Sequence, residues 1–197
     1  MYPYVETICI DEGKAENIRY HNRRMNLTRR ERWGHADALR LEEVLTDLPR
    51  QAGRIKGRIL YGSEGIGEIT FEPYEMRPVR SLKLVECDDI DYHLKSTDRS
   101  RLNELRSRRG TCDDIIIVKE GLLTDTSYAN IALFDGLVWV TPRRPLLEGT
   151  RRASLLDSGL LTEAELSPAD LPRFSRIALI NAMIKLGELV LPTSAVE

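Results

Sequence analysis

The chain has 197 residues, 42% of them hydrophobic, a length that suits one compact domain or two small lobes with a real core. Its 29 basic and 31 acidic residues nearly balance, which argues against a general affinity for nucleic acid or anionic membranes. No apolar stretch approaches the ~20 residues of a membrane span, and three cysteines without C-x-x-C spacing indicate cytoplasmic thiols rather than disulfides or a metal site.

The first half of the chain alternates between β-like and helical patterns. In chain order these patterns predict a strand, two helices and two β-rich segments over residues 2–10, 13–34, 35–49, 53–62 and 67–86. Pro49 would end the second helix. Residues 1–86 are therefore predicted to form a small α+β lobe.

The second half is richer in strands. After the polar segment 87–95, the predicted elements are a helix over 98–108, a strand over 113–121, the turn "TDTSYAN" over 124–130, and strands over 129–136 and 137–142. They are followed by a helix that begins after "LLEGT" (146–150), a proline-rich connection over 167–175, and strands over 176–181 and 188–192. We take residues 87–197 as a larger C-terminal lobe. The predicted fold class is α+β, with a cleft between the two lobes.

Six arginines lie between residues 19 and 32. Such a basic helix can bind nucleic-acid phosphates, but basic residues exceed acidic ones only slightly over residues 1–60, so a solvated helix face is the favoured interpretation. Arg24 follows His21 by three residues, so both side chains can face inward from one side of the helix.

Two residues of the second half could carry chemistry. Lys95 ends the segment between the lobes, where a desolvated amine would become nucleophilic, as Schiff-base chemistry requires. Asp125 lies between two strand-like runs, where a carboxylate can hold the proton of a cofactor ring nitrogen. A surface lysine and an ordinary Asx turn are the competing explanations.

Gly149 and Thr150 come directly before an apolar-periodic helix. Free amides and the helix dipole make such an N-terminus a seat for phosphate, although a routine helix start explains the pair equally well. Neither glycine-rich nucleotide motif, G-x-x-x-x-G-K-[ST] or G-x-G-x-x-G, occurs in the chain. Together these residues supply an amine, a carboxylate and a phosphate seat.

Six segments stand out in chain order: "YVETICI", "HNRRM", "YHLKSTDRSRLNEL", "LLTDTSYANIALFDG", "PLLEGTRRASLL" and "ALINAMIKLGELVLP". Together they resemble the motifs of the class IV aminotransferase family, the fold type IV pyridoxal phosphate enzymes. The resemblance covers nearly the whole chain. It implies the two-lobed fold of D-amino acid aminotransferase and a homodimer whose pocket lies near the subunit interface.

The resemblance also implies a role for each matching residue. The cofactor would be pyridoxal phosphate, Lys95 would carry it as a Schiff base, and Asp125 would pair with its pyridine nitrogen. The implied cofactor-binding residues are Arg24, Lys95, Asp125, Gly149, Thr150, Arg151, Asn181 and Ala182.

The chain departs from the family pattern at several positions. Asp125 stands where the family usually has the longer Glu, Arg151 replaces a usual Thr, and Ala182 occupies a position where relatives often carry a hydroxyl. The chain also begins almost at the first motif, without the N-terminal strand and turn of longer members. These departures leave cofactor binding better supported than any particular substrate.

The expected reaction is amino-group transfer between an amino acid and a 2-oxo acid, inferred from the breadth of the family. A 4-amino-4-deoxychorismate lyase, which releases 4-aminobenzoate and pyruvate, is the alternative enzyme. A cofactor-binding homologue without turnover is the alternative from another class. Arg77, Tyr74 and Tyr92 are the candidate substrate residues, although packed aromatic rings explain the two tyrosines equally well.

Overall fold

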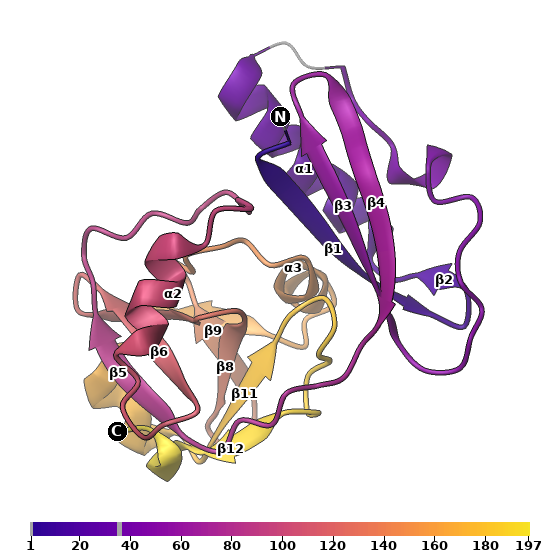
Figure 1. The fold of residues 1–197 in the computed structure, drawn as a ribbon. Coiled ribbons are helices and arrows are strands. Elements are labelled where there is room, and N and C mark those ends of the chain that lie inside the picture. Colours follow the sequence, from indigo (N-terminus) through magenta and orange to yellow (C-terminus); the bar gives the residue numbers. More distant parts are fainter. Residues whose placement is uncertain (1, 35–36) are drawn as a thin grey trace. The chain divides into compact units, whose positions relative to one another are not determined.

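The structure is a computed structural model that describes residues 2–34 and 37–197 (Figure 1). It consists of two compact units, of which unit 1 comprises the chain up to Met76 together with Leu94–Asp98, and unit 2 comprises Arg77–His93 and Arg99–Glu197. The continuous part of unit 1 thus ends at Met76, whereas the predicted lobe ended at residue 86. Lys95 belongs to unit 1.

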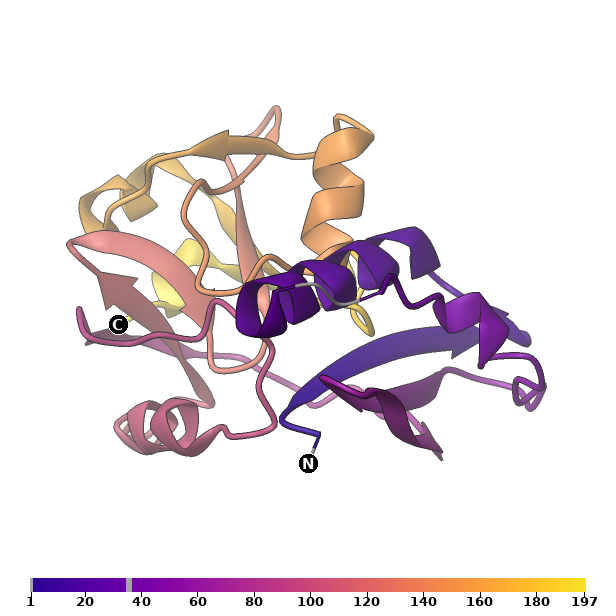
Figure 2. The same ribbon diagram turned by 90° about the horizontal axis from the view of Figure 1, so that it is seen from above.

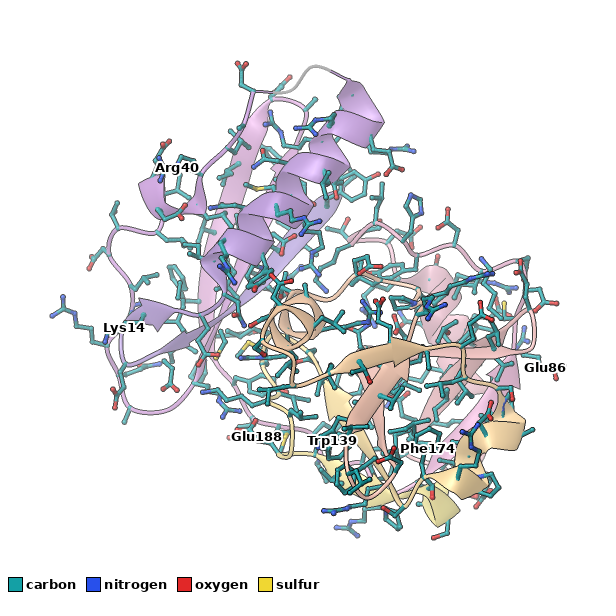
Figure 3. The ribbon with its side chains drawn as sticks, turned by 180° about the vertical axis from the view of Figure 1, so that it is seen from behind. Lys14, Arg40, Glu86, Trp139, Phe174 and Glu188 are labelled. Atoms are coloured by element: carbon teal, nitrogen blue, oxygen red, sulfur yellow. The ribbon has the colours of Figure 1, made fainter. Side chains whose placement is uncertain are left out.

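Unit 1 is an antiparallel sheet with one long helix. Its elements are β1 (Tyr4–Asp11), β2 (Lys14–Ala15), α1 (Ile18–Trp33), the 3-10 turn η1 (Leu41–Glu43), β3 (Ile55–Gly62) and β4 (Gly65–Pro73). The strand order is β2-β1-β3-β4, and α1 lies along one face of this sheet (Figure 2). Ile8, Met25 and Ile59 are fully buried between helix and sheet. At the β1–β2 hairpin, Lys14 is exposed and points away from the sheet (Figure 3).

The helix predicted over residues 35–49 is wrong where the structure describes it, because this segment forms only the short turn η1. The side chains of two asparagines of α1 bind the backbone of this segment instead. Asn26 exchanges two hydrogen bonds of 2.8 Å with the backbone of Leu39, and Asn22 accepts one of 2.9 Å from the amide of Leu41. Because side chains already satisfy these backbone groups, the favourable helix propensity of the segment is overridden.

Unit 2 is a larger mixed sheet. Its elements are β5 (Leu82–Glu86), α2 (Ser100–Ser107), β6 (Asp114–Lys119), β7 (Leu122–Thr126), β8 (Asn130–Phe134), β9 (Trp139–Pro142), α3 (Thr150–Asp157), β10 (Thr162–Ala164), η2 (Pro168–Arg173), β11 (Arg176–Ile180), β12 (Val190–Pro192) and η3 (Thr193–Ala195). The main strand order is β10-β9-β8-β7-β6-β5, and β11 pairs with both β8 and β12. Strand β5 pairs in parallel with β6, which is why residues 82–86 belong to unit 2. The fold is therefore α+β, as predicted.

Strand β7 shortens the turn predicted over residues 124–130, since only residues 127–129 form a bend between β7 and β8. Glu120 and Gly121 have φ angles of 51° and 75°, so they close the β6–β7 hairpin in the left-handed region. The chain then runs as a strand through Thr126. The carboxylate of Asp125 consequently projects from a buried strand and not from an open turn.

Candidate functional site

A buried carboxylate forms the centre of the polar cluster in unit 1. Glu6 of β1 is fully buried and accepts hydrogen bonds from Arg24 Nε at 2.9 Å and from Arg24 Nη2 at 2.5 Å. Nδ1 of His21, also fully buried, lies 2.6 Å from the Glu6 carboxylate. The three-residue spacing of His21 and Arg24 on α1 therefore turns both side chains inward, as the sequence predicted.

Charge decides the protonation of this cluster. Burial raises the pKa of Glu6, but Arg24 and His21 outweigh burial and bring that pKa down from 4.5 to about 2. Burial also lowers the pKa of His21, although the hydrogen bond to Glu6 opposes this shift. Glu6 is thus an anion paired with the Arg24 cation, while the imidazole of His21 is driven toward its neutral form.

Lys95 lies beside this cluster because its segment pairs with β1. The backbone carbonyl of Lys95 accepts a hydrogen bond of 3.1 Å from the amide of Val5, the residue next to Glu6. Thr97 extends the pairing, since its amide and its hydroxyl both donate to the carbonyl of Pro3. The positive charge of Lys95 contributes to the lowered pKa of His21, which shows that the amine lies within electrostatic reach of the cluster. Unit 1 thereby brings together Arg24 and Lys95, two of the predicted site residues.

Unit 2 contains a buried carboxylate of a different kind. Asp125 Oδ1 accepts a hydrogen bond of 2.8 Å from Asn130 Nδ2, and Asp125 Oδ2 accepts one of 2.9 Å from the amide of Leu147. Both donors are neutral, and within the described residues no basic side chain is ion-paired with Asp125. Burial therefore dominates and raises the pKa of Asp125 from 3.8 to about 7.

Asn130 joins Asp125 to the turn that precedes α3. Besides binding the carboxylate, its Nδ2 donates a hydrogen bond of 2.9 Å to the carbonyl of Leu147. A Cβ at Gly149 would lie 1.9 Å from Asn130 Oδ1, so any other residue there would force the Asn130 side chain to shift. The φ angle of Gly149 is −69°, an ordinary value, so this glycine is needed for space and not for an unusual backbone conformation.

The residues of the predicted phosphate seat lie at the N-terminal turn of α3. Gly149 is the N-cap residue and Thr150, which is buried, is the first helical residue. Arg151 Nη2 donates a hydrogen bond of 3.2 Å to the carbonyl of Ala182, so the structure brings these two predicted residues together. The amide of Asn181 donates to the carbonyl of Ile184 at 3.2 Å and is engaged within its own loop.

The three candidate substrate residues are divided between the two units. Tyr74 belongs to unit 1, where its amide donates to the carbonyl of Arg54 at 2.9 Å. In unit 2, Arg77 Nη2 binds the buried carboxylate of Asp114 at 2.8 Å. Tyr92 is partly buried and packs against a hydrophobic cluster of the same unit. Their role in substrate binding stays a prediction.

Sequence reasoning missed two residues that organise these clusters. Glu6 appeared only as a letter of the first motif, yet it holds both His21 and Arg24. Asn130 was passed over in the same way. The available signal was the acidic residue inside an otherwise apolar strand, since a buried charge requires partners.

The residues fit pyridoxal phosphate by the chemistry of their groups. A buried carboxylate that only neutral donors satisfy suits a protonated ring nitrogen, because it has spare lone pairs and gains a compensating charge. The backbone amides at the start of a helix suit a phosphate, and the Lys95 amine suits an aldehyde. Within the described ranges, no cluster of three or more acidic, His or Cys side chains could hold a metal, and no helix has the length and apolarity to span a membrane.

Comparison with known proteins assigns the chain to a family. A protein of Haemophilus influenzae without a described activity is 39% identical over 187 residues, covering 93% of this chain and 98% of its own. A crystal structure of a candidate 4-amino-4-deoxychorismate lyase from Haemophilus somnus is 35% identical, with a TM-score of 0.87 over 94% of this chain and 98% of that one.

A more distant structure, the pyridoxal phosphate-bound form of a hypothetical aminotransferase from Mycobacterium tuberculosis, shares the fold. It is 16% identical with a TM-score of 0.73, over 99% of this chain and 81% of that one. Residues 66–189, more than half of the chain, match the family model "Amino-transferase class IV". The chain therefore belongs to the class IV aminotransferase family.

Proposed function

We propose that this chain is a pyridoxal phosphate-dependent enzyme that acts on the amino group of a small carboxylate-bearing substrate. The observation that carries the proposal is Asp125, a buried carboxylate whose hydrogen-bond donors, Asn130 and the Leu147 amide, are both neutral. Burying such a group without a cation is costly, so its presence on a central strand favours a site for a positively charged partner. A fold relative solved with the cofactor bound supports the same cofactor here.

Each residue would have a defined task. Asp125 would accept a hydrogen bond from the pyridine nitrogen and keep that nitrogen protonated, while Arg24 and the amides around Thr150 would bind the phosphate. Lys95 Nζ would bind the aldehyde carbon and, once displaced by the substrate amine, would move a proton at the substrate carbon beside that amine. Bound pyridoxal phosphate supplies an electron sink for the negative charge that forms at this carbon.

Borohydride reduction followed by peptide mass analysis tests the role of Lys95. In the presence of pyridoxal phosphate, the reduced cofactor should be found on the peptide that contains Lys95. The matched control is Lys14→Ala, since Lys14 is exposed on the β1–β2 hairpin and should leave the labelling unchanged (Figure 3). A Lys95→Ala protein that retains the same label would exclude Lys95 as the cofactor lysine.

Two reactions remain candidates for this site. Amino-group transfer to a 2-oxo acid is the reaction expected from the family as a whole. Conversion of 4-amino-4-deoxychorismate to 4-aminobenzoate and pyruvate is favoured by the 35% identical Haemophilus somnus structure, which bears that lyase description. Pyruvate formed without any 2-oxo acid acceptor would identify the lyase, and exchange of amino groups would identify the transferase. Cofactor binding with neither product would identify a homologue without turnover.

We further propose a cytoplasmic homodimer. Strand β4 is at one edge of the unit 1 sheet and carries Phe71 with 38% of its surface exposed, so an unpaired edge and apolar surface coincide. A symmetric pair of subunits would cover this edge. Light scattering should give the mass of a dimer at micromolar concentration, and a monomer that binds the cofactor and turns over substrate would contradict the proposal.

A further inference from the structure

We propose that Asn130 is a positioning residue that fixes the Asp125 carboxylate and the Leu147–Thr150 turn as one rigid element. This inference rests on the proposed function for its meaning, since Asp125 and this turn are the groups proposed to bind the ring nitrogen and the phosphate. Asn130 itself needs no contact with the cofactor. Its geometry can be tested with or without the cofactor.

The geometric argument starts from a closed set of hydrogen bonds. The amide nitrogen of Asn130 donates to Asp125 Oδ1 at 2.8 Å and to the carbonyl of Leu147 at 2.9 Å, which uses both of its N–H groups. The amide of Leu147 returns a bond of 2.9 Å to Asp125 Oδ2. Asp125, Asn130 and the backbone of Leu147 in the turn thus hold each other, so a shift of one of them breaks hydrogen bonds to the other two.

Steric contact supports the same conclusion independently. The space beside Gly149 is filled by the Asn130 side chain, because a Cβ there would approach Asn130 Oδ1 to 1.9 Å. Gly149 is also the N-cap residue of α3. The side chain that orients the Asp125 carboxylate therefore also determines how closely the backbone at the start of α3 packs against β8.

The neighbouring charges do not replace Asn130. Arg152 of α3, which is fully buried, favours the ionised form of Asp125, whereas Glu148 opposes it. Arg152 is already paired with Glu148 at 3.1 Å and with Glu163 at 2.6 Å. Asn130 and the Leu147 amide are therefore the direct donors that oppose the effect of burial on the Asp125 carboxyl.

The first test titrates Asp125 in cofactor-free protein by NMR of carboxyl-labelled aspartate. Removal of the donor in Asn130→Ala should raise the pKa of Asp125 by about one to two units, because a hydrogen bond to a charged group contributes roughly 1.5–3 kcal/mol. Asn130→Asp, which keeps the shape of the side chain, should raise it as well and serves if the alanine variant does not fold. Asn103→Ala, at an exposed position of α2, should leave it unchanged.

The second test is a double-mutant cycle between Asn130 and Gly149, measured as the dissociation constant of pyridoxal phosphate. Gly149→Ala alone should weaken binding roughly tenfold or more, since the new Cβ displaces Asn130, whereas in the Asn130→Ala background the same change should cost little. Additive effects in this cycle, or an unchanged Asp125 titration in both Asn130 variants, would overturn the positioning role. If Asp125 titrates as expected but the protein never binds pyridoxal phosphate, the proposed function would be overturned instead.

Discussion

Glu6 of unit 1 and Asp125 of unit 2 are both buried carboxylates, and their surroundings are opposite. In unit 1, Glu6 is bound by the guanidinium of Arg24 and the imidazole of His21, and its pKa falls to about 2. In unit 2, Asp125 is bound by the neutral donors Asn130 and Leu147, and its pKa rises to about 7. Both carboxylates are buried, so the donors decide the difference.

The chain itself supplies the positively charged partner of Glu6, whereas we propose that a ligand supplies the one for Asp125. Glu6 has its own cation and serves to hold Arg24 in place. Asp125 has acceptor capacity and lacks a paired positive charge, which a protonated ring nitrogen would supply. The charge of its partners therefore distinguishes a structural buried carboxylate from a candidate ligand-binding one better than burial alone does.

The largest effect is expected from breaking the cluster of unit 1. Glu6→Gln would leave the Arg24 cation without its buried counter-charge, and we expect a loss of about 3–5 kcal/mol in the free energy of unfolding. Urea denaturation measures this loss. Glu42→Gln is the matched control, because Glu42 is exposed and binds only Asn22 among its described side-chain partners, and it should change stability by less than about 0.5 kcal/mol. Equal effects of the two changes would refute the structural role of Glu6.

The two carboxylates should also give stability opposite dependences on pH. The folded chain retains the Asp125 proton up to about pH 7, while the unfolded chain releases it near 3.8, so raising the pH through this range favours unfolding. The titration of Asp125 lowers the free energy of unfolding by on the order of 4 kcal/mol at most across this range. Glu6 acts with the other sign, since its stabilisation is complete above pH 4.5 and is lost as the pH falls toward 2.

Comparison of the wild type with Asp125→Asn isolates the Asp125 contribution. His21 would otherwise mask it, because its lowered pKa makes stability rise with pH up to about 6.5. In cofactor-free protein, the unfolding free energy of the variant relative to the wild type should increase between pH 4 and 7 and then level off. A constant difference across this range would show that Asp125 titrates normally.

A smaller effect is expected on cofactor affinity. Asp125→Asn removes the negative charge proposed to face the ring nitrogen, so the dissociation constant of pyridoxal phosphate should rise about 10- to 100-fold, the equivalent of a charged hydrogen bond. Fluorescence titration measures it. Asp135→Asn is the control, since Asp135 is exposed at the end of β8 and binds only backbone amides in the described structure. An unchanged constant for Asp125→Asn would argue against the ring contact.

The smallest effect concerns the phosphate seat. Ala182→Ser restores a hydroxyl beside the Arg151 contact, and we expect pyridoxal phosphate to bind up to about tenfold more tightly, by roughly one hydrogen bond. Binding of pyridoxal, which has no phosphate, should not change. Tighter binding of both compounds would place the new hydroxyl away from the phosphate.

Sequence patterns predicted the helices and strands that depend on local periodicity. The strand over residues 2–10, helix α1 and the strand "RIALIN" follow from alternation or helical spacing, and the structure confirms them. The helix over residues 35–49 failed because the side chains of Asn22 and Asn26, more than ten residues away, bind its backbone. Contacts of this kind have no local signature.

The residues of the candidate site likewise divide into those that the sequence indicated and those that only the structure revealed. Motif spacing pointed to Arg24, Lys95 and Asp125, whereas Glu6 and Asn130 emerged only when the structure placed them beside these residues. Gly149 was predicted for the close approach of a phosphate, and the structure gives a different reason for a glycine there. Its lack of a Cβ makes room for Asn130, a contact between the start of α3 and the start of β8 that no sequence pattern encodes.

The most direct test of the central claim is the titration of Asp125 with and without pyridoxal phosphate. NMR of carboxyl-labelled aspartate, with the signal assigned through Asp125→Asn, should give a pKa near 7 in cofactor-free protein. With saturating pyridoxal phosphate the carboxylate should stay ionised to below about pH 5, because the protonated ring nitrogen stabilises the anion. Bound cofactor with the Asp125 titration still centred near pH 7 would contradict the account.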